Sequence, residues 1–161
     1  MKNNKWILLA EDDANTAELT IGALEAERLG CTLVLARDGA EALDCLHRYD
    51  KGEAGSASPP ILVLLDMKMP RMDGLETLRR IKADERLRSI PVVMLTSSRH
   101  ESDLVRSYGL GANAYVVKPV EFREFRRALA LVAEFWATVN EPPPDAVPSA
   151  AESRTQLAAA V

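Results

Sequence analysis

Acidic, hydroxyl and amine side chains follow four short apolar runs of this chain, and such a set could carry out phosphoryl chemistry. Glu11 and Asp12 follow one run and Asp66 follows another, while Thr96 and Lys118 follow two more. A carboxylate is a competent nucleophile for phosphoryl transfer, which otherwise depends on positioning and charge neutralisation. If these residues share a pocket, every group that an aspartyl phosphate site needs is present.

Three carboxylates in one pocket would also need a cation. Like charges a few ångströms apart repel, so a bare cluster either binds a cation or shifts its pKa values. Oxygen ligands suit Mg²⁺, which would be held by two carboxylates and the backbone carbonyl of Lys68, two residues past Asp66. The ammonium of Lys118 would add a second positive charge, and a cis peptide before Pro119 would aim it inward.

Each of these residues also has a simpler interpretation. Asp13 is expected to be the N-cap of the next helix, and Thr96 alone would indicate an ordinary turn. The methionines Met67, Met69 and Met72 could suggest a soft metal site, but no His or Cys accompanies them and loop packing is favoured. What favours a functional site is the arrival of acids, a hydroxyl and an amine at four successive strand ends.

Alternating strand-like and helix-like segments must position these side chains. Apolar runs predict strands at 7–10, 32–36, 61–65, 92–95 and 114–117, and the run 61–65 is typical of a strand buried on both faces. Apolar spacing predicts helices over about 17–29, 39–49, from Gly74 onward, 101–110 and 121–139. Five β–α units predict a doubly wound α/β fold with a five-stranded parallel sheet. The strand order 2-1-3-4-5 would place the ends of strands 1, 3 and 4 around one crevice.

The length of 161 residues fits one domain, which we assign to residues 1–140. Residues 51–60 are rich in Gly, Ser and Pro and predict a long flexible loop. Residues 141–161 begin with a run of prolines, continue with Ala and Ser, and are expected to form a disordered tail.

Composition excludes several function classes. A net charge of -4 argues against a nucleic-acid binder, which needs a basic face. No apolar run approaches the roughly 20 residues of a membrane helix, and an apolar signal segment is missing from the start, so a cytoplasmic location is expected. Cys31 and Cys45 lack metal-site spacing and are expected to be buried free thiols.

The chain is similar to the receiver domains of two-component response regulators, which have a flavodoxin-like fold. The resemblance covers residues 5 to 139 and is carried by the segments Ile7-Leu8-Leu9-Ala10-Glu11-Asp12-Asp13, Leu65-Asp66-Met67-Lys68-Met69-Pro70-Arg71-Met72-Asp73-Gly74, Pro91-Val92-Val93-Met94-Leu95-Thr96-Ser97 and Ala114-Tyr115-Val116-Val117-Lys118-Pro119. It implies a phosphoprotein whose aspartate accepts a phosphoryl group from a sensor histidine kinase in Mg²⁺-dependent phosphorelay signalling.

The resemblance also implies a role for each site residue. Asp66 would be the phosphoacceptor, and the Mg²⁺ ligands would be Asp66, Asp12, Glu11 mainly through water, and Lys68 through its carbonyl. Thr96 would be the switch hydroxyl that moves to the phosphoryl group, and Tyr115 the aromatic side chain that follows it inward. Lys118 would pair with the phosphoryl group. The protein would then be a phosphoacceptor with self-catalysed phosphorylation and dephosphorylation, not an enzyme acting on a separate substrate.

Two features resemble the stand-alone receivers that partner bacterial and cyanobacterial phytochrome kinases. These are the long loop 51–60 and a last helix that runs into Phe135-Trp136 before Pro142. Output would then be a protein contact or onward phosphotransfer. A homodimer could form through the fourth helix, fifth strand and fifth helix or through the C-terminal helix, where aromatic residues such as Trp136 would lie partly in the interface.

Two other classes compete with this interpretation. A phosphohydrolase with an aspartyl intermediate would want an acid two residues after the nucleophile, where this chain has Lys68. A pseudo-receiver would keep the fold as an interaction module without phosphorylation, and the presence of Asp12, Asp66, Thr96 and Lys118 argues against it.

Overall fold

Five parallel strands form one sheet in the order β2-β1-β3-β4-β5, as the sequence predicts. The computed structural model describes residues 5–50 and 58–144. Most of the predicted loop 51–60 and of the predicted tail 141–161 lies outside the described residues, so the predictions for these segments stay predictions. None of the helices in the described ranges combines the length and hydropathy that crossing a bilayer requires.

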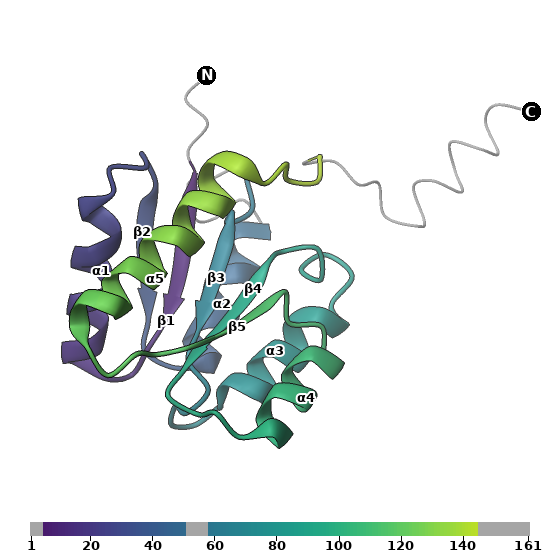
Figure 1. Cartoon of the computed structure of the whole chain (residues 1–161). Coiled ribbons are helices and arrows are strands. Elements are labelled where there is room, and N and C mark those ends of the chain that lie inside the picture. The colour runs from purple at the N-terminus through teal and green to yellow at the C-terminus, as the bar shows by residue number, and fades with distance from the viewer. Residues whose placement is uncertain (1–4, 51–57, 145–161) are drawn as a thin grey trace, which may run out of the picture.

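The strands and helices alternate throughout the described chain (Figure 1). The strands are β1 (Trp6–Ala10), β2 (Thr32–Ala36), β3 (Leu62–Leu65), β4 (Val92–Thr96) and β5 (Ala114–Val117). The helices are α1 (Ala14–Ala26), α2 (Gly39–Asp50), α3 (Gly74–Ala83), α4 (Glu101–Gly109) and α5 (Phe122–Glu134), which continues into a short π-helix, η1 (Phe135–Val139).

Helices cover both faces of the sheet, which explains why the central strands are apolar without alternation. Leu8 and Val63 of the central strands point to the side of α2 and α3, where they join one buried cluster. Ile7 and Leu64 point the other way and pack with α1 and α5 in a second cluster. All nine residues of β1 and β3 are buried, so the two strands that carry the acids are fixed in the middle of the molecule.

Four local predictions are wrong. Helix α1 ends at Ala26 instead of continuing to Leu29, because Arg28 and Gly30 adopt left-handed backbone angles, φ 51° and 68°. The sequence also predicts a weak apolar stripe of Leu104, Val105 and Tyr108 on the helix 101–110, but in α4 Val105 and Tyr108 are 65% and 52% exposed. The peptide bond from Lys118 to its proline is trans. Cys45 is buried as expected, but Cys31 is only partly buried.

Candidate functional site

The sheet itself brings the predicted site residues to one edge. Its hydrogen bonds continue one residue beyond the strands: the Glu11 N–H donates to the Ala36 carbonyl at 3.0 Å, and the Asp66 N–H donates to the Ala10 carbonyl at 3.1 Å. On the side of β4 and β5 the Lys118 N–H donates to the Thr96 carbonyl at 2.7 Å. Rigid backbone therefore sets the positions of the acids, the hydroxyl and the lysine.

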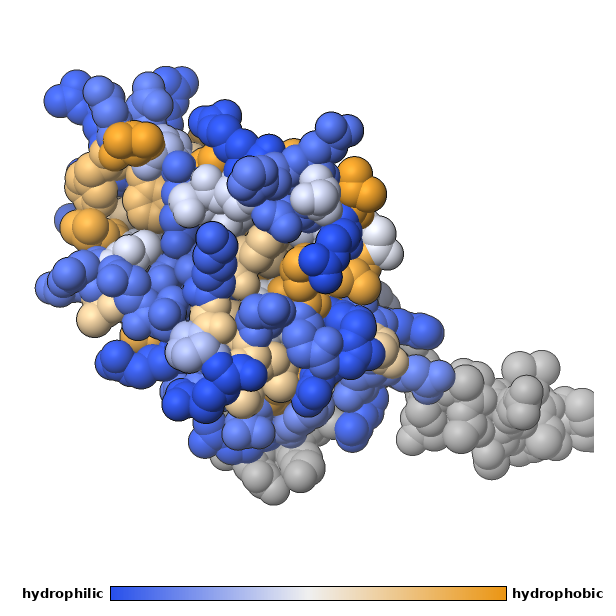
Figure 2. Space-filling model, turned by 90° about the horizontal axis from the view of Figure 1, so that it is seen from below, coloured by the Kyte–Doolittle hydropathy of each residue, from blue (hydrophilic) through white to orange (hydrophobic). Residues whose placement is uncertain are grey.

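Three acidic side chains meet at this edge. Glu11, Asp12 and Asp66 each offer a carboxylate oxygen, and these oxygens lie within 4.8 Å of one another. Glu11 is buried, Asp66 is partly buried and Asp12 is exposed, so the cluster reaches from the interior to the surface. The face seen from this edge is dominated by hydrophilic residues, with apolar residues between them (Figure 2).

Lys118 supplies the positive charge of the cluster. Its Nζ donates to Glu11 Oε2 at 2.7 Å and lies 3.6 Å from Asp66 Oδ2. The other carboxylate oxygen of Glu11 accepts the Asp13 N–H at 3.1 Å, which fixes the Glu11 side chain between α1 and β5. One ammonium facing three carboxylates leaves excess negative charge, and the all-oxygen ligand set fits a hard divalent cation such as Mg²⁺.

Asp66 is poised for protonation in the absence of a metal ion. Burial raises the pKa of its carboxyl to about 6, and the nearby negative charge of Glu11 adds to the rise. Lys118 and the Met67 N–H, which donates to Asp66 Oδ1 at 2.8 Å, oppose the shift. A divalent cation at this position would replace the missing positive charge and favour the ionised, nucleophilic form.

Asp13 is the N-cap of α1, as predicted. Its carboxylate accepts the Thr16 N–H at 2.6 Å, and this hydrogen bond lowers the pKa of Asp13. Asp13 is thus occupied with the helix, while its neighbour Asp12 is left to the acidic cluster.

The loop after β3, residues 66–74, wraps the phosphoacceptor candidate closely. Met67 and Met69 are buried in the core, as the loop-packing interpretation predicts. The Gly74 N–H donates to the Met67 carbonyl at 2.8 Å, and a Cβ at Gly74 would lie only 2.1 Å from the Asp66 carbonyl oxygen. Only glycine fits this close approach. Lys68, in the same loop, is exposed.

Thr96 and Tyr115 belong to a hydrogen-bond network on the opposite side of the acidic cluster from the loop 66–74. Thr96 is buried, and its hydroxyl accepts the Ser98 N–H at 3.2 Å. The Tyr115 hydroxyl donates to the Ser98 carbonyl at 2.9 Å, and the Ser98 hydroxyl donates to Asp103 of α4 at 2.6 Å. Ser98 therefore joins the hydroxyl, the aromatic ring and the start of α4.

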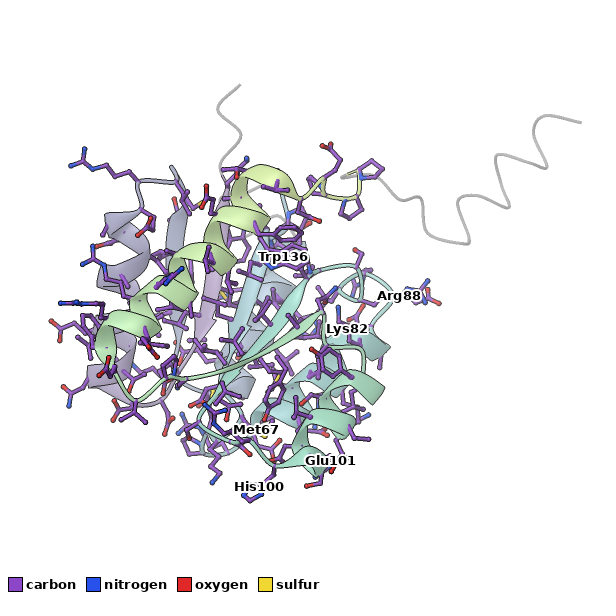
Figure 3. All side chains as sticks on the ribbon, in the orientation of Figure 1. Met67, Lys82, Arg88, His100, Glu101 and Trp136 are labelled. Atoms are coloured by element: carbon purple, nitrogen blue, oxygen red, sulfur yellow. The ribbon has the colours of Figure 1, made fainter. Side chains whose placement is uncertain are left out.

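The sequence prediction missed Ser98 as this junction. It also missed the ion pair of Arg71 with buried Asp38, which connects two loops beside the site. Ser98, Arg71 and Asp38 do not directly follow a strand, and a position directly at a strand end is the signal that identifies the other site residues in the sequence. Figure 3 locates this edge of the sheet by Met67 and His100, with Trp136 at the opposite end of the molecule.

Known proteins are similar to this chain in sequence and fold. The sequence model of the family described as the response regulator receiver domain matches residues 7–130. The chain is 43% identical over 139 residues to the probable methanogenesis regulatory protein FilR2 of Methanothrix harundinacea, covering 85% of this chain and 86% of that protein. It is 35% identical over 132 residues to response regulator Rcp1 of Synechocystis, covering 82% and 88%.

Solved structures of response regulators have a similar fold. The phosphorylated cyanobacterial phytochrome response regulator RcpA superposes with a TM-score of 0.79 at 36% identity, covering 88% of this chain and 99% of that one. The Mn²⁺-bound form of Rcp1 superposes with a TM-score of 0.78 at 33% identity, covering 87% and 99%.

Proposed function

Since the chain belongs to the response regulator receiver domain family, we propose that it accepts a phosphoryl group on Asp66 from a sensor histidine kinase. The observation that carries the proposal is the cluster in which the Asp66 carboxylate lies 3.6 Å from the Lys118 ammonium and beside two further acids. An Asp66 oxygen would attack phosphorus, while the bond from phosphorus to the donor nitrogen or oxygen breaks and the donor keeps the electron pair.

The other side chains would neutralise and orient the transferred group. Asp12, Asp66, Glu11 through water and the Lys68 carbonyl would hold Mg²⁺, which neutralises phosphoryl oxygens when bound. Lys118 would leave Glu11 and pair with a phosphoryl oxygen. The Thr96 hydroxyl would donate to another, and movement of Thr96 would be passed through Ser98 to Tyr115 and α4. Water would later attack phosphorus while the bond from phosphorus to the Asp66 oxygen breaks, which releases phosphate and restores the carboxylate. The protein would therefore signal without turning over a separate substrate.

Intact mass after incubation with acetyl phosphate and Mg²⁺ tests the phosphoacceptor. We expect one phosphoryl adduct on the wild type and none on Asp66→Asn. Asp73→Asn is the matched control, because Asp73 lies in the same loop but caps α3 through the Glu76 N–H at 2.9 Å, a role that Asn keeps. An adduct on Asp66→Asn would contradict the assignment, and so would a wild type that forms no adduct and binds no beryllofluoride.

We further propose a phytochrome-type kinase as the donor and the cytoplasm as the location. The similarity to RcpA, a cyanobacterial phytochrome response regulator, supports the first proposal. Two free cysteines fit a reducing compartment, which supports the second proposal.

A groove between α1 and α5 beside the site, with Leu19 and Phe122 each 48% exposed, offers an apolar surface to the kinase. Faster phosphotransfer from a phytochrome kinase than from an unrelated histidine kinase is expected, and equal rates would contradict this pairing.

A homodimer is the partner that the outer face of the last helix favours. Leu131, Phe135 and Val139 recur at every fourth position and are 60%, 45% and 68% exposed. Trp136 packs edge-on against Phe135, with ring centroids 5.0 Å apart. We propose that this C-terminal helix, or the α4–β5–α5 face, pairs with a second copy. Sedimentation as a dimer, weakened by Phe135→Ser and Trp136→Ala, is expected; equal sedimentation of the wild type and both variants as monomers would contradict it.

A further inference from the structure

The loop that carries the Lys68 carbonyl is tied to a second loop that the proposed chemistry does not use. Arg71 donates through Nε to Asp38 Oδ2 at 2.7 Å and through Nη2 to the same oxygen. Asp38 lies between β2 and α2 and is 2% exposed, whereas the Arg71 side chain is 71% exposed. A charged hydrogen bond to a buried carboxylate is stronger than an exposed pair of the same type.

Backbone contacts beside the ion pair hold the same two loops together. The Gly39 N–H donates to the Met72 carbonyl at 3.3 Å. A Cβ at Gly39 would lie 2.8 Å from that carbonyl oxygen and 1.9 Å from Thr77 Oγ1 of α3, so the two loops approach more closely than any other residue permits. The start of α2 therefore supports the loop after β3 along its outer side.

Arg71 adopts a backbone angle that needs such support. Its φ is 62°, in the left-handed region that costs free energy for a residue with a Cβ. Asp38 is held in turn by α2, because its Oδ1 accepts the Glu41 N–H at 2.8 Å. The strained turn at Arg71 lies three residues after Lys68 and is fixed to an anchored helix start.

We propose that Arg71 and Asp38 are positioning residues that clamp the loop 66–74 and hold the Lys68 carbonyl in place as a ligand for Mg²⁺. The inference rests on the proposed function for the identity of the metal site. Residues that orient metal ligands typically change metal affinity by about ten- to a hundredfold when mutated. Removing the clamp should therefore weaken Mg²⁺ binding without removing any ligand.

Titration calorimetry with Mg²⁺ tests the clamp without any phosphodonor. Arg71→Ala and Asp38→Asn should each raise the Kd for Mg²⁺ about tenfold. The double variant should be no worse than either single one, because both break the same interaction. Asn keeps the α2 cap that Asp38 provides, so Asp38→Asn removes the charge and leaves the helix start intact.

Three further variants separate the clamp from strain and from general charge loss. Arg71→Gly removes the side chain and relieves the left-handed angle, so the clamp predicts the same loss as Arg71→Ala, whereas wild-type affinity would mean that only the turn matters. Arg71→Lys should restore part of the affinity. Arg79→Ala is the control, because Arg79 pairs with Glu76 at 2.7 Å on the surface of α3, and it should bind Mg²⁺ like the wild type.

The outcomes distinguish this inference from the proposed function. A wild type that binds Mg²⁺ and takes the phosphoryl group, together with an unchanged Kd in Arg71→Ala, would overturn the clamp and leave the proposed function standing. A tenfold loss in Arg71→Ala with a wild type that forms no phosphoryl adduct and binds no beryllofluoride would support the clamp and overturn the function. Thermal unfolding of each variant verifies that it is folded, and a wild type without measurable Mg²⁺ binding would overturn the clamp.

Discussion

The two sides of the acidic cluster are built differently. On one side the loop 66–74 leads into α3, which buries five of its ten residues. On the other side the loop after Thr96 leads into α4, where Ser107 is the single residue of the nine-residue helix that is buried. Since burial of apolar surface holds a helix to its sheet, α4 is attached far more weakly than α3.

Their local interactions differ in the same way. The β3 side is fixed by a glycine that admits no side chain, by two buried methionines and by the Arg71 ion pair. The β4 side is held by hydroxyl hydrogen bonds centred on Ser98. The hydroxyl of buried Ser107 is the one polar side-chain atom among the described residues that is buried without a hydrogen-bond partner. The difference suggests that one side holds the metal while the other moves.

The largest effect on stability is expected from Gly74→Ala, on the side of the loop after β3. Its Cβ would lie 2.1 Å from the Asp66 carbonyl oxygen, a backbone atom, so the loop must shift. We expect a loss of about 2–3 kcal/mol of unfolding free energy, measured by denaturant unfolding. The displaced loop should also bind Mg²⁺ more weakly.

Gly22→Ala is the matched control for that substitution. Gly22 lies inside α1 with nothing within 4 Å of its added Cβ, so alanine should raise the unfolding free energy by about 0.5–1 kcal/mol. If Gly74→Ala were as stable as the wild type, the loop after β3 would be as adaptable as the loop after β4, and the comparison would fail.

An intermediate effect is expected from pH, acting on the metal side. The pKa of Asp66 is about 6 in the metal-free protein, so below this pH protons compete with Mg²⁺ for the carboxylate. The Kd for Mg²⁺ should rise about tenfold between pH 7 and pH 5 and stay nearly constant above pH 7. Calorimetry across this pH range measures the Kd, and a pH-independent Kd would contradict the raised pKa of Asp66.

The same pKa has a consequence for stability. The ordinary value is 3.8, so between about pH 4 and 6 the folded state binds more protons than the unfolded state. The stability of the metal-free protein should therefore fall as pH rises through this window and then level off. Asp66→Asn should remove this part of the pH dependence, and an unchanged profile in Asp66→Asn would assign it to another group.

The sequence predicted this fold, and it predicted which side chains gather at one edge of the sheet, because it marks strand ends plainly. Asp66 is the first polar residue after the buried run of β3, and Lys118 is the first polar residue after the partly buried run of β5. The attachment of α4 could not be predicted, because Val105 and Tyr108 are apolar but face outward. The Asp38–Arg71 pair was also missed, because the two residues lie far apart in the sequence. The left-handed backbone angle of Arg71 is likewise not signalled by its residue type.

The smallest effect is expected from Ser98→Ala on the switch side. It removes the hydrogen bonds from the Ser98 hydroxyl to Asp103 and from the His100 N–H to that hydroxyl. We expect a loss of about 1 kcal/mol, seen as about fivefold faster hydrogen exchange at the start of α4. The neighbouring, exposed Ser97→Ala should leave exchange unchanged, and equal effects of the two substitutions would argue against Ser98 as the junction.

Hydrogen exchange with and without Mg²⁺ and beryllofluoride, a mimic of the phosphoryl group, tests the central claim most directly. We expect exchange to change in the loop after Thr96, in α4 and around Tyr115, while α3 keeps its exchange rates. Asp66→Asn should show no change in either region. Equal changes in α3 and α4, or a wild type that responds nowhere, would contradict a site with one fixed side and one moving side.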